Sequence, residues 1–282
     1  FLSLFLVLGV FRMNNIGKKY FDLEYMDILA RGRSPLHRLD PRAKLMTTLL
    51  FIITVVSFGK YTLLALIPFL MYPVFLVSAG GLPAGYFMKK ILTVLPFVLL
   101  MGIFNPVIDR TIVARVGAVD ISGGWVSFLS ILLRFFLTAS SALLLIALTG
   151  FNAVCGALTN LGVPKPFIVQ LMFFYRYLFV LGDEAHGMDR ARALRSSPAG
   201  MVRTKTFFSM TGHLLLRTFE RAERIYRAMN CRGFDGRVPM LQPGRMSVRD
   251  FGFMAGWAFL FFTFRVYHIP LTLGEWLRGA LR

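Results

Sequence analysis

Two arginines, Arg195 and Arg232, each stand at the end of a charged segment whose residues favour a helix. Arg195 is followed closely by Pro198, and Arg232 directly by Gly233, so a chain breaker closes each segment. A guanidinium is planar and permanently charged, and it donates paired hydrogen bonds to carboxylates or carbonyls. At the tip of a rigid helix such a group suits a groove in a partner protein. A lipid bilayer alone has no need of helices of this kind.

Side chains for enzymatic chemistry are scattered along the chain. The four His and two Cys form no CxxC or HExxH pattern, and no GxxxxGK[ST] phosphate loop occurs. One cluster, Asp183, His186 and Asp189, has the spacing to present metal ligands on one side of a helix. We interpret it instead as a solvated surface that balances Arg190 and Arg192. No metal, cofactor or enzymatic activity is therefore expected.

The segment before Arg232 predicts a helix from about Thr204 to Cys231, ended by Gly233. Apolar residues repeat along it at 4-3-4-3 spacing, which predicts a face that packs against another helix. This face consists of Leu215, Phe219, Ala222, Tyr226 and Met229. Two ion pairs in the favourable i,i+4 order are expected on the other faces, each worth a few tenths of a kcal/mol. They are Glu220 with Arg224 and Glu223 with Arg227.

The segment before Arg195 begins after a double-proline break at Pro164 and Pro166. Its first half, residues 167–181, is apolar, but roughly 15 residues are short for a membrane span. A crossing there would also upset the distribution of charge between the two sides of the membrane. We therefore expect one long helix that lies against the membrane face or the other spans and continues as polar helix to Ser196.

Composition indicates an integral membrane protein. Of 282 residues, 56% are hydrophobic and 16% are charged, against about 25% charged in soluble domains. Segments close to the roughly 17–25 residues that cross a bilayer predict about five spans in an all-α fold. They are Ala43–Phe58, Tyr61–Ala79, Ile91–Ile108, Trp125–Thr149 and Phe251–Tyr267. The opening run Phe1–Phe11 is expected to lie at the interface or to form a partial sixth span.

The net charge of +18 would suggest nucleic acid in a soluble protein, but here the charges lie beside the spans. Residues 12–44 carry eight Lys/Arg and residues 160–250 carry fifteen, whereas residues 109–123 carry two. Cytoplasmic segments retain basic residues, so the N-terminus and residues 150–250 are expected in the cytoplasm. Arg134, within the fourth span, has two open interpretations: a partner-facing or gating charge, and a structural or snorkelling one.

Four segments, in this order, resemble the transmembrane T component of energy-coupling-factor transporters, most closely the cobalt and nickel branch of the CbiQ type. They are Leu39-Asp40-Pro41-Arg42-Ala43-Lys44-Leu45, Gly162-Val163-Pro164, Arg195-Ser196 and Arg232-Gly233-Phe234-Asp235-Gly236. In that family Ala-Arg-Ser and Ala-Arg-Gly end two coupling helices, and the arginines dock in two ATP-binding-cassette ATPases. The resemblance implies that Arg195, Ser196, Arg232 and Gly233 are the docking residues. Leu194 and Cys231 stand where the signatures have alanine.

The resemblance further implies a division of labour. The partner ATPases hydrolyse ATP, a substrate-binding membrane subunit (S component) captures cobalt or nickel, and this non-enzymatic chain couples them in the cell inner membrane. Alternatives are a conventional permease subunit with its own substrate pathway and a vitamin-branch scaffold of the same transporter class. The expected organisation is a partly interfacial N-terminal segment (1–42), transmembrane helices 1–4 (43–149), a cytoplasmic coupling domain of two long arginine-ended helices (150–250), and a last transmembrane helix and tail (251–282).

Overall fold

The computed structural model describes residues 25–32, 34–59, 62–108, 112–116, 119–195, 204–236 and 246–266. The expectations for Phe1–Phe11 and for Ser196 fall outside these ranges. Most described residues are helical, and the expected all-α fold is confirmed. Contacts divide the chain into two compact units, residues 28–157 with 243–282, and residues 1–27 with 158–242. We call them the transmembrane unit and the coupling unit, and we describe each by itself.

The transmembrane unit starts its helical bundle with α3 (Pro41–Val56). Asp40 caps this helix, because its Oδ1 accepts a hydrogen bond from the Arg42 N–H at 2.8 Å. Pro41 fills the first helical position, where its missing N–H has no partner to lose. The following helices are α4 (Leu63–Leu66), the 3-10 turn η2 (Ile67–Leu70), α5 (Met71–Gly80), α6 (Ala84–Gly102), α7 (Phe104–Ile108), α8 (Gly123–Thr149) and α12 (Val248–Val266).

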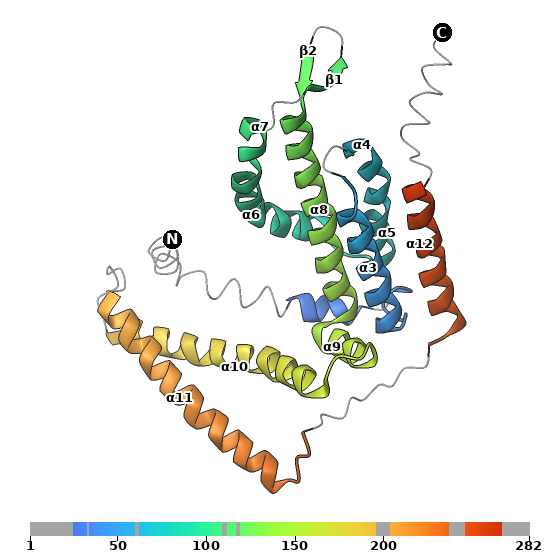
Figure 1. Ribbon diagram of the computed structural model, residues 1–282. Coiled ribbons are helices and arrows are strands. Elements are labelled where there is room, and N and C mark those ends of the chain that lie inside the picture. Colours follow the sequence, from blue (N-terminus) through green and yellow to red (C-terminus); the bar gives the residue numbers. More distant parts are fainter. Residues whose placement is uncertain are drawn as a thin grey trace. The chain divides into compact units, whose positions relative to one another are not determined.

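The core of this unit lies where α3 packs between α8 and α12 (Figure 1). Aromatic rings from three helices meet there. The ring centroid of Tyr72 lies 4.6 Å from that of Phe51 and 4.9 Å from that of Trp257. Thr48 satisfies the buried hydroxyl of Tyr72 at 2.8 Å. Phe261 lies 5.3 Å from Phe51, so aromatic packing joins α12 to α3 and α5.

Three described segments have the length and composition of a membrane span: Leu63–Gly80, Ala84–Pro106 and Gly123–Thr149. They correspond to the second, third and fourth expected spans. Helix α3 has only 16 residues, and α12, with 19, carries three charged side chains. The first and fifth spans, and hence the count of five, remain predictions.

Proline and glycine shape the spans. The second span changes to 3-10 geometry at Pro68, because a proline cannot donate to the i→i−4 ladder. Glycines permit close helix contacts: a Cβ on Gly80 would lie 2.8 Å from Leu148 Cδ2, and one on Gly102 would lie 2.8 Å from the Phe128 ring. Small residues at contacts of this kind let helices approach closely in membranes.

A short antiparallel hairpin of β1 (Ile112–Val116) and β2 (Val119–Ser122) connects α7 to α8. The sequence indicated only a connecting segment at residues 109–123. The hairpin is rich in valine and isoleucine, whose branched Cβ favours extended backbone. The helical class of the fold is unchanged by this addition.

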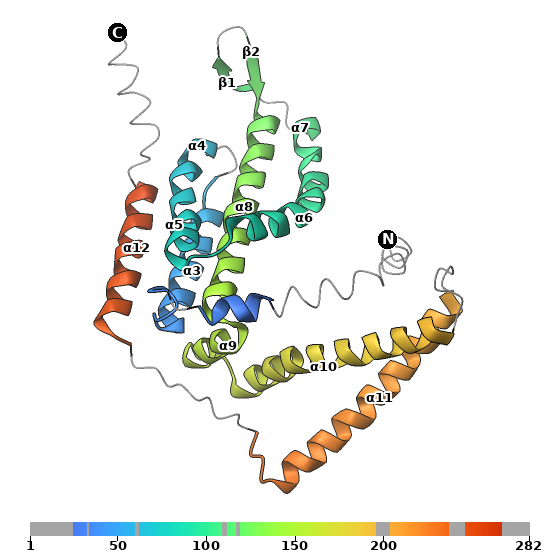
Figure 2. The ribbon, with the colours of Figure 1, turned by 180° about the vertical axis from the view of Figure 1, so that it is seen from behind.

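The coupling unit is built on two long helices, α10 (Lys165–Arg195) and α11 (Thr204–Cys231). The chain reaches them through α9 (Phe151–Asn160), and Gly162, with φ of 92°, lies in the turn after this helix. The expected bounds of α11 agree with the structure to the residue. Figure 2 shows α10 and α11 diverging from the end at which α10 stops and α11 starts.

Candidate functional site

Arg232 stands in the turn that terminates α11. Gly233 adopts φ of 74°, and its N–H donates to the Asn230 carbonyl at 3.0 Å, while the Phe234 N–H donates to the Met229 carbonyl at 3.1 Å. These two bonds form a Schellman turn, whose left-handed residue favours glycine. The turn fixes the end of the helix and thereby the position from which the exposed Arg232 side chain projects.

Arg195 is the last residue of α10, and it is exposed. One turn earlier the guanidinium of Arg192 is held by Asp189, with Nη2 at 2.9 Å from Oδ1. Arg195 itself lines an open polar hollow of about 880 Å³, to which Thr206 at the start of α11 also belongs. The end of α10 therefore carries one arginine fixed on its own helix and a second arginine at the tip.

The two tip arginines lie at opposite ends of α11. Arg195 adjoins its start, and Arg232 follows its last residue. The helix has 28 residues, which gives a length of about 42 Å. Within the described residues neither guanidinium has an ion-pair partner. Two charges separated in this way can each bind a different protein subunit.

An apolar groove of about 650 Å³ runs between α10 and α11. Four members of the predicted stripe, Phe219, Ala222, Tyr226 and Met229, line it from α11, and Phe173, Tyr177 and Leu181 line it from α10. Beyond the Schellman turn the chain folds back, so that the Phe234 ring lies 6.4 Å from the Phe173 ring. The fifth member of the stripe, Leu215, lies outside the groove.

The stripe side chains stay open to their surroundings. Phe219 is 64% exposed, Tyr226 62% and Leu215 56%. These fractions exceed those of residues packed in a helix–helix core, so α10 and α11 share the groove without closing it. Packing of the stripe against the first coupling helix stays a prediction for the assembled protein. Clustered exposed apolar side chains commonly mark protein–protein contact surfaces.

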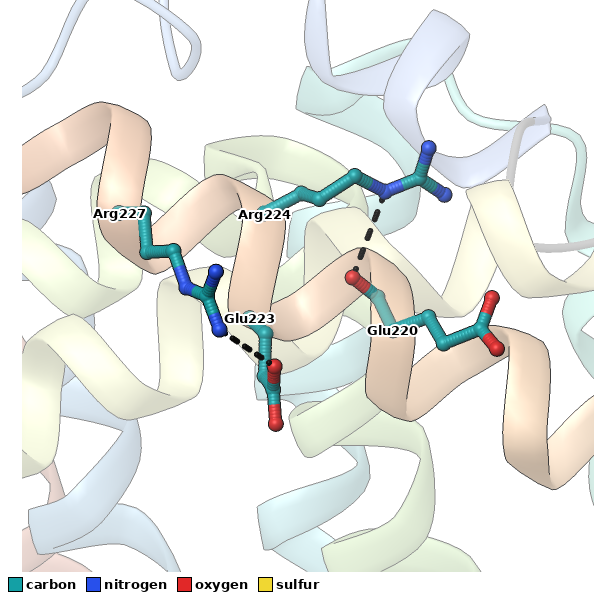
Figure 3. A network of polar contacts seen from close by, with 4 residues as sticks. All are labelled: Glu220, Glu223, Arg224 and Arg227. Atoms are coloured by element: carbon teal, nitrogen blue, oxygen red, sulfur yellow. Dashed lines mark hydrogen bonds and ion pairs between the residues drawn. The ribbon is translucent and has the colours of Figure 1, made fainter.

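One of the two expected ion pairs is formed on α11 (Figure 3). Arg227 Nη2 lies 3.1 Å from Glu223 Oε2. Arg224 instead donates through Nε to the backbone carbonyl of Glu220 at 3.4 Å, and Figure 3 shows the Glu220 carboxylate turned away from this guanidinium. The predicted Glu220–Arg224 pair is therefore replaced by a contact with the main chain. Exposed pairs contribute little energy in either arrangement.

The acidic cluster on α10 faces arginines. Glu184 forms an ion pair with Arg217 of α11, and Asp189 pairs with Arg192. Within the ranges that the structure describes, no three His, Cys, Asp or Glu side chains are arranged to hold a metal ion. The Glu184–Arg217 pair links α10 to α11.

A contact between Asp27 and Tyr175 of α10 was not predicted from the sequence. Burial raises the pKa of Tyr175, and the hydrogen bond with Asp27 and the charge of that carboxylate raise it further. Both residues belong to the coupling unit, so the segment before the first crossing between units is attached to α10. No local pattern around Asp27 indicates a partner so distant in sequence.

Arg134 of α8 has a structural partner. Its Nη2 donates to the carbonyl of Gly59, just beyond the end of α3. Arg265 of α12 donates similarly to the carbonyl of Ser57 at 3.2 Å. The last carbonyls of a helix lack partners within the helix and attract cations. The structural interpretation of Arg134 is therefore favoured over a gating charge.

Several buried hydroxyls in α3 and α8 donate within their own helices. Thr47 bonds the Ala43 carbonyl at 2.7 Å, and Ser140 bonds the Phe136 carbonyl at 2.6 Å. Such back-bonding satisfies a polar side chain inside an apolar bundle. Thr47 and Ser140 therefore fit a packed core of helices.

Fold and site together define a helical membrane protein that presents two arginine-tipped helices and an apolar groove. The chain belongs to the CbiQ family of cobalt transport proteins, whose family model matches residues 32–243. It is similar to energy-coupling factor transporter transmembrane protein EcfT from Ruminiclostridium cellulolyticum, at 27% identity over 75% of this chain and 85% of the relative. EcfT from Bacillus subtilis is 27% identical over 73% of this chain and 82% of the relative.

A putative fused cobalt transport protein CbiMQ from Methanocorpusculum labreanum is 33% identical over 89 residues, or 31% of this chain and 15% of that protein. The family match and the EcfT relatives identify the chain as a T component of an energy-coupling-factor transporter, of the CbiQ type. Its role is that of an energy-coupling membrane subunit.

Proposed function

We propose that this chain couples two ATP-binding-cassette ATPases to a substrate-binding membrane subunit for the uptake of Co²⁺ or Ni²⁺. The observation that carries the proposal is the pair of exposed arginines, Arg195 and Arg232, at opposite ends of α11. Each guanidinium docks in one ATPase, and Ser196 and Gly233, the residues that follow the two arginines, take part in docking. The separation of about 42 Å along α11 gives each ATPase its own contact.

The apolar groove supports contact with the substrate-binding subunit. Its lining has exposed aromatic side chains at Phe219 and Tyr226, which fit an apolar helix of a partner membrane protein. ATP-driven approach of the two ATPases would move the helix tips. Rigid helices pass that displacement to whatever occupies the groove, so ATP hydrolysis is linked to reorientation of the substrate-binding subunit. The ATPases perform the chemistry, and this chain remains non-catalytic.

The coupling unit is assigned to the cytoplasmic side of the cell inner membrane. The support comes from charge: residues 160–250 carry fifteen Lys/Arg, and basic segments remain cytoplasmic. Cobalt is favoured as cargo because the family model is described as cobalt transport protein and a fused cobalt transport protein is among the relatives. The alternative is that the chain is the scaffold of a vitamin transporter of the same class, because the EcfT relatives are not named for cobalt.

Copurification and labelling test the docking. The full chain, expressed with its neighbouring ATPase genes, should copurify with two ATPase copies and a small membrane subunit. Cys231 is exposed beside Arg232, whereas Cys155 is buried. A maleimide should therefore label Cys231 and not Cys155. Bound ATPase should slow labelling of Cys231. Unchanged labelling together with absent ATPase would refute the coupling role and favour a permease with its own pathway.

Uptake by vesicles containing the purified complex tests the cargo. We expect ATP-dependent accumulation of radioactive Co²⁺ or Ni²⁺. The complex could instead contain both ATPases and accumulate a vitamin but neither metal ion. The coupling role would then stand, and the assignment of a metal ion as cargo would be wrong.

A further inference from the structure

The chain passes between its two units three times, at residues 27/28, 157/158 and 242/243. Within the transmembrane unit, each crossing adjoins a segment that is hydrogen-bonded to one small polar cluster. The cluster consists of Asp40, Lys44 and Asp250, whose side chains are buried although all three are ionisable. His37 extends the cluster toward the first crossing. Burial of three ionisable groups at one point is energetically demanding and calls for specific partners.

Asp250 serves two helices with one carboxylate. Its Oδ2 accepts the Ser247 N–H at 2.7 Å, which is the carboxylate half of a capping box at the start of α12. Its Oδ1 accepts the Asp40 N–H at 2.9 Å, at the start of α3. The positive ends of two helix dipoles thus meet one negative charge. The segment that enters from the third crossing is fixed to the first helix of the bundle.

Lys44 holds the segment that leads to the second crossing. Its Nζ donates to the Leu148 carbonyl at 3.0 Å, in the last turn of α8. It also reaches the His37 carbonyl at 3.5 Å. A cation at a helix C-terminus satisfies a carbonyl that has no partner within the helix. The end of α8, from which the chain continues into α9, is therefore attached to α3.

His37 holds the segment that follows the first crossing. Its Nε2 lies 3.0 Å from the Leu29 carbonyl and its Nδ1 lies 2.7 Å from Ser34 Oγ. A neutral ring that donates from Nε2 and accepts at Nδ1 satisfies both contacts. The ring leaves no space beside Gly32, where an added Cβ would lie 2.7 Å away. All three entering segments are thus held by neighbouring parts of one network.

We propose that Lys44, with Asp40 and Asp250, is a positioning cluster that joins the three entering segments into one rigid base. Movement of the coupling unit reaches the transmembrane unit only through these segments and through noncovalent contact. If the segments were fixed independently, each would absorb displacement by fraying its own helix end. Joined at one point, they move together. The proposal rests on the proposed coupling function and adds residues that touch neither ATPase nor cargo.

The chemistry of the cluster favours positioning over simple stabilisation. Buried ion clusters are often no more stabilising than apolar residues of the same size, and in some proteins they fix a specific geometry. Here all three side chains bond backbone groups at helix ends, where apolar substitutes would fill space without fixing position. We therefore expect that a variant of the cluster still assembles into the complex but no longer passes movement of the coupling unit to the transmembrane unit.

Two measurements on the reconstituted full complex test the proposal. The first compares hydrogen–deuterium exchange with and without a nonhydrolysable ATP analogue. In the wild type we expect nucleotide-dependent changes in residues 158–236 and also in α3 and α8. In Lys44→Met the changes should be confined to residues 158–236. The second is Co²⁺ uptake per ATP hydrolysed, which should fall roughly tenfold, the factor expected from one lost charge-assisted hydrogen bond.

Controls separate the possible outcomes. Lys44→Arg keeps the cation and should restore most of the transmission, and Lys89→Met, at an exposed lysine of α6, should behave as wild type. If Lys44→Met fails to reach the membrane, Asp250→Asn is judged by the same two measurements. The proposal is overturned if the variant complex assembles and still shows wild-type exchange changes in α3 and α8 and wild-type uptake per ATP. It is also overturned if these changes are lost only to the extent that the complex fails to assemble. A wild-type complex without any nucleotide-dependent change refutes the coupling function itself.

Discussion

The Asp250 carboxylate accepts a hydrogen bond from the Asp40 N–H at 2.9 Å, across 210 positions of sequence. The contact joins the N-terminus of the last described helix to that of α3, the first helix of the bundle. Because aromatic packing between Phe51 and Phe261 holds the same two helices further along, α3 and α12 are fixed at two levels. The two helices therefore behave as one rigid element.

The double variant Arg195→Ala, Arg232→Ala should lose ATPase attachment and ATP-driven uptake. Each docked guanidinium makes charge-assisted bonds worth about 1.5–3 kcal/mol, and both tips are exposed in this chain. Pull-down of the ATPases measures the effect. Arg190→Ala, at an exposed arginine of α10 short of its tip, is the matched control. Wild-type uptake by a normally inserted double variant would contradict the docking assignment.

Gly233→Ala should destabilise the end of α11 by about 1 kcal/mol. The residue adopts φ of 74°, a conformation in which a Cβ is strained. Gly212→Ala, inside α11 with open space around the added Cβ, should instead stabilise the helix by about 0.5–1 kcal/mol. Thermal unfolding of the two variants gives the comparison. Equal effects of the same sign would show that the turn does not need glycine.

The isolated chain should neither hydrolyse ATP nor bind Co²⁺ or Ni²⁺ tightly. Of the candidate ligands on α10, Asp189 already pairs with Arg192, and Glu184, next to Asp183, pairs with Arg217. Calorimetry on the purified subunit tests metal binding, with His186→Ala as the comparison. A stoichiometric micromolar site that disappears in this variant would show that the acidic cluster binds metal.

The region around His37 should open as pH falls. Burial lowers the pKa of His37 below its usual value of 6.5, and the charge of Lys44 lowers it further, against an opposing hydrogen bond to Leu29. The unfolded chain then binds the proton more readily than the folded one. Neutral His37 therefore contributes to the stability of the folded state above about pH 6.5, and this contribution is lost as pH falls through the pKa of His37 in the folded chain.

Hydrogen exchange of residues 29–39, corrected for intrinsic rates, measures this opening at about pH 7.5 and about pH 5.5. His37→Gln removes the titrating group and should remove the pH dependence. An NMR titration of His37 with a midpoint at or above 6.5 would contradict the assigned direction.

Local signals predicted helix α11 well. The 4-3-4-3 stripe and Gly233 defined α11 to its last residue, because helix periodicity and a left-handed stop are encoded in neighbouring positions. Prediction failed where side-chain geometry decides. The i,i+4 spacing of Glu220 and Arg224 permits an ion pair, yet the guanidinium bonds the main chain instead. Exposed pairs differ too little in energy for spacing alone to choose between these states.

The contacts that organise the transmembrane unit were not predictable. Ser247 and Asp250 show the spacing of a capping box. Nothing in the neighbouring sequence indicates that the Asp250 carboxylate also accepts a hydrogen bond from the Asp40 N–H. Lys44 at the start of an apolar helix suggests an interfacial charge, whereas it is 4% exposed and bonds Leu148. These partners depend on tertiary packing between segments more than a hundred positions apart.

Phe219→Ala should uncouple ATP hydrolysis from uptake while the ATPases remain bound. Phe219 lines the apolar groove but is 64% exposed, so its removal should change the stability of the isolated chain by less than about 1 kcal/mol. Its exposed ring surface is instead available to the substrate-binding subunit, and loss of that contact should lower uptake per ATP. Phe174→Ala is the matched control, because Phe174 is 63% exposed on α10 and lies outside the groove. Both ATP hydrolysis and uptake can be measured in reconstituted vesicles.

Equal uptake per ATP in the Phe219→Ala and Phe174→Ala variants would mean that the groove makes no contact needed for coupling. A large loss of stability in Phe219→Ala alone would instead support the interpretation that the stripe packs against another helix.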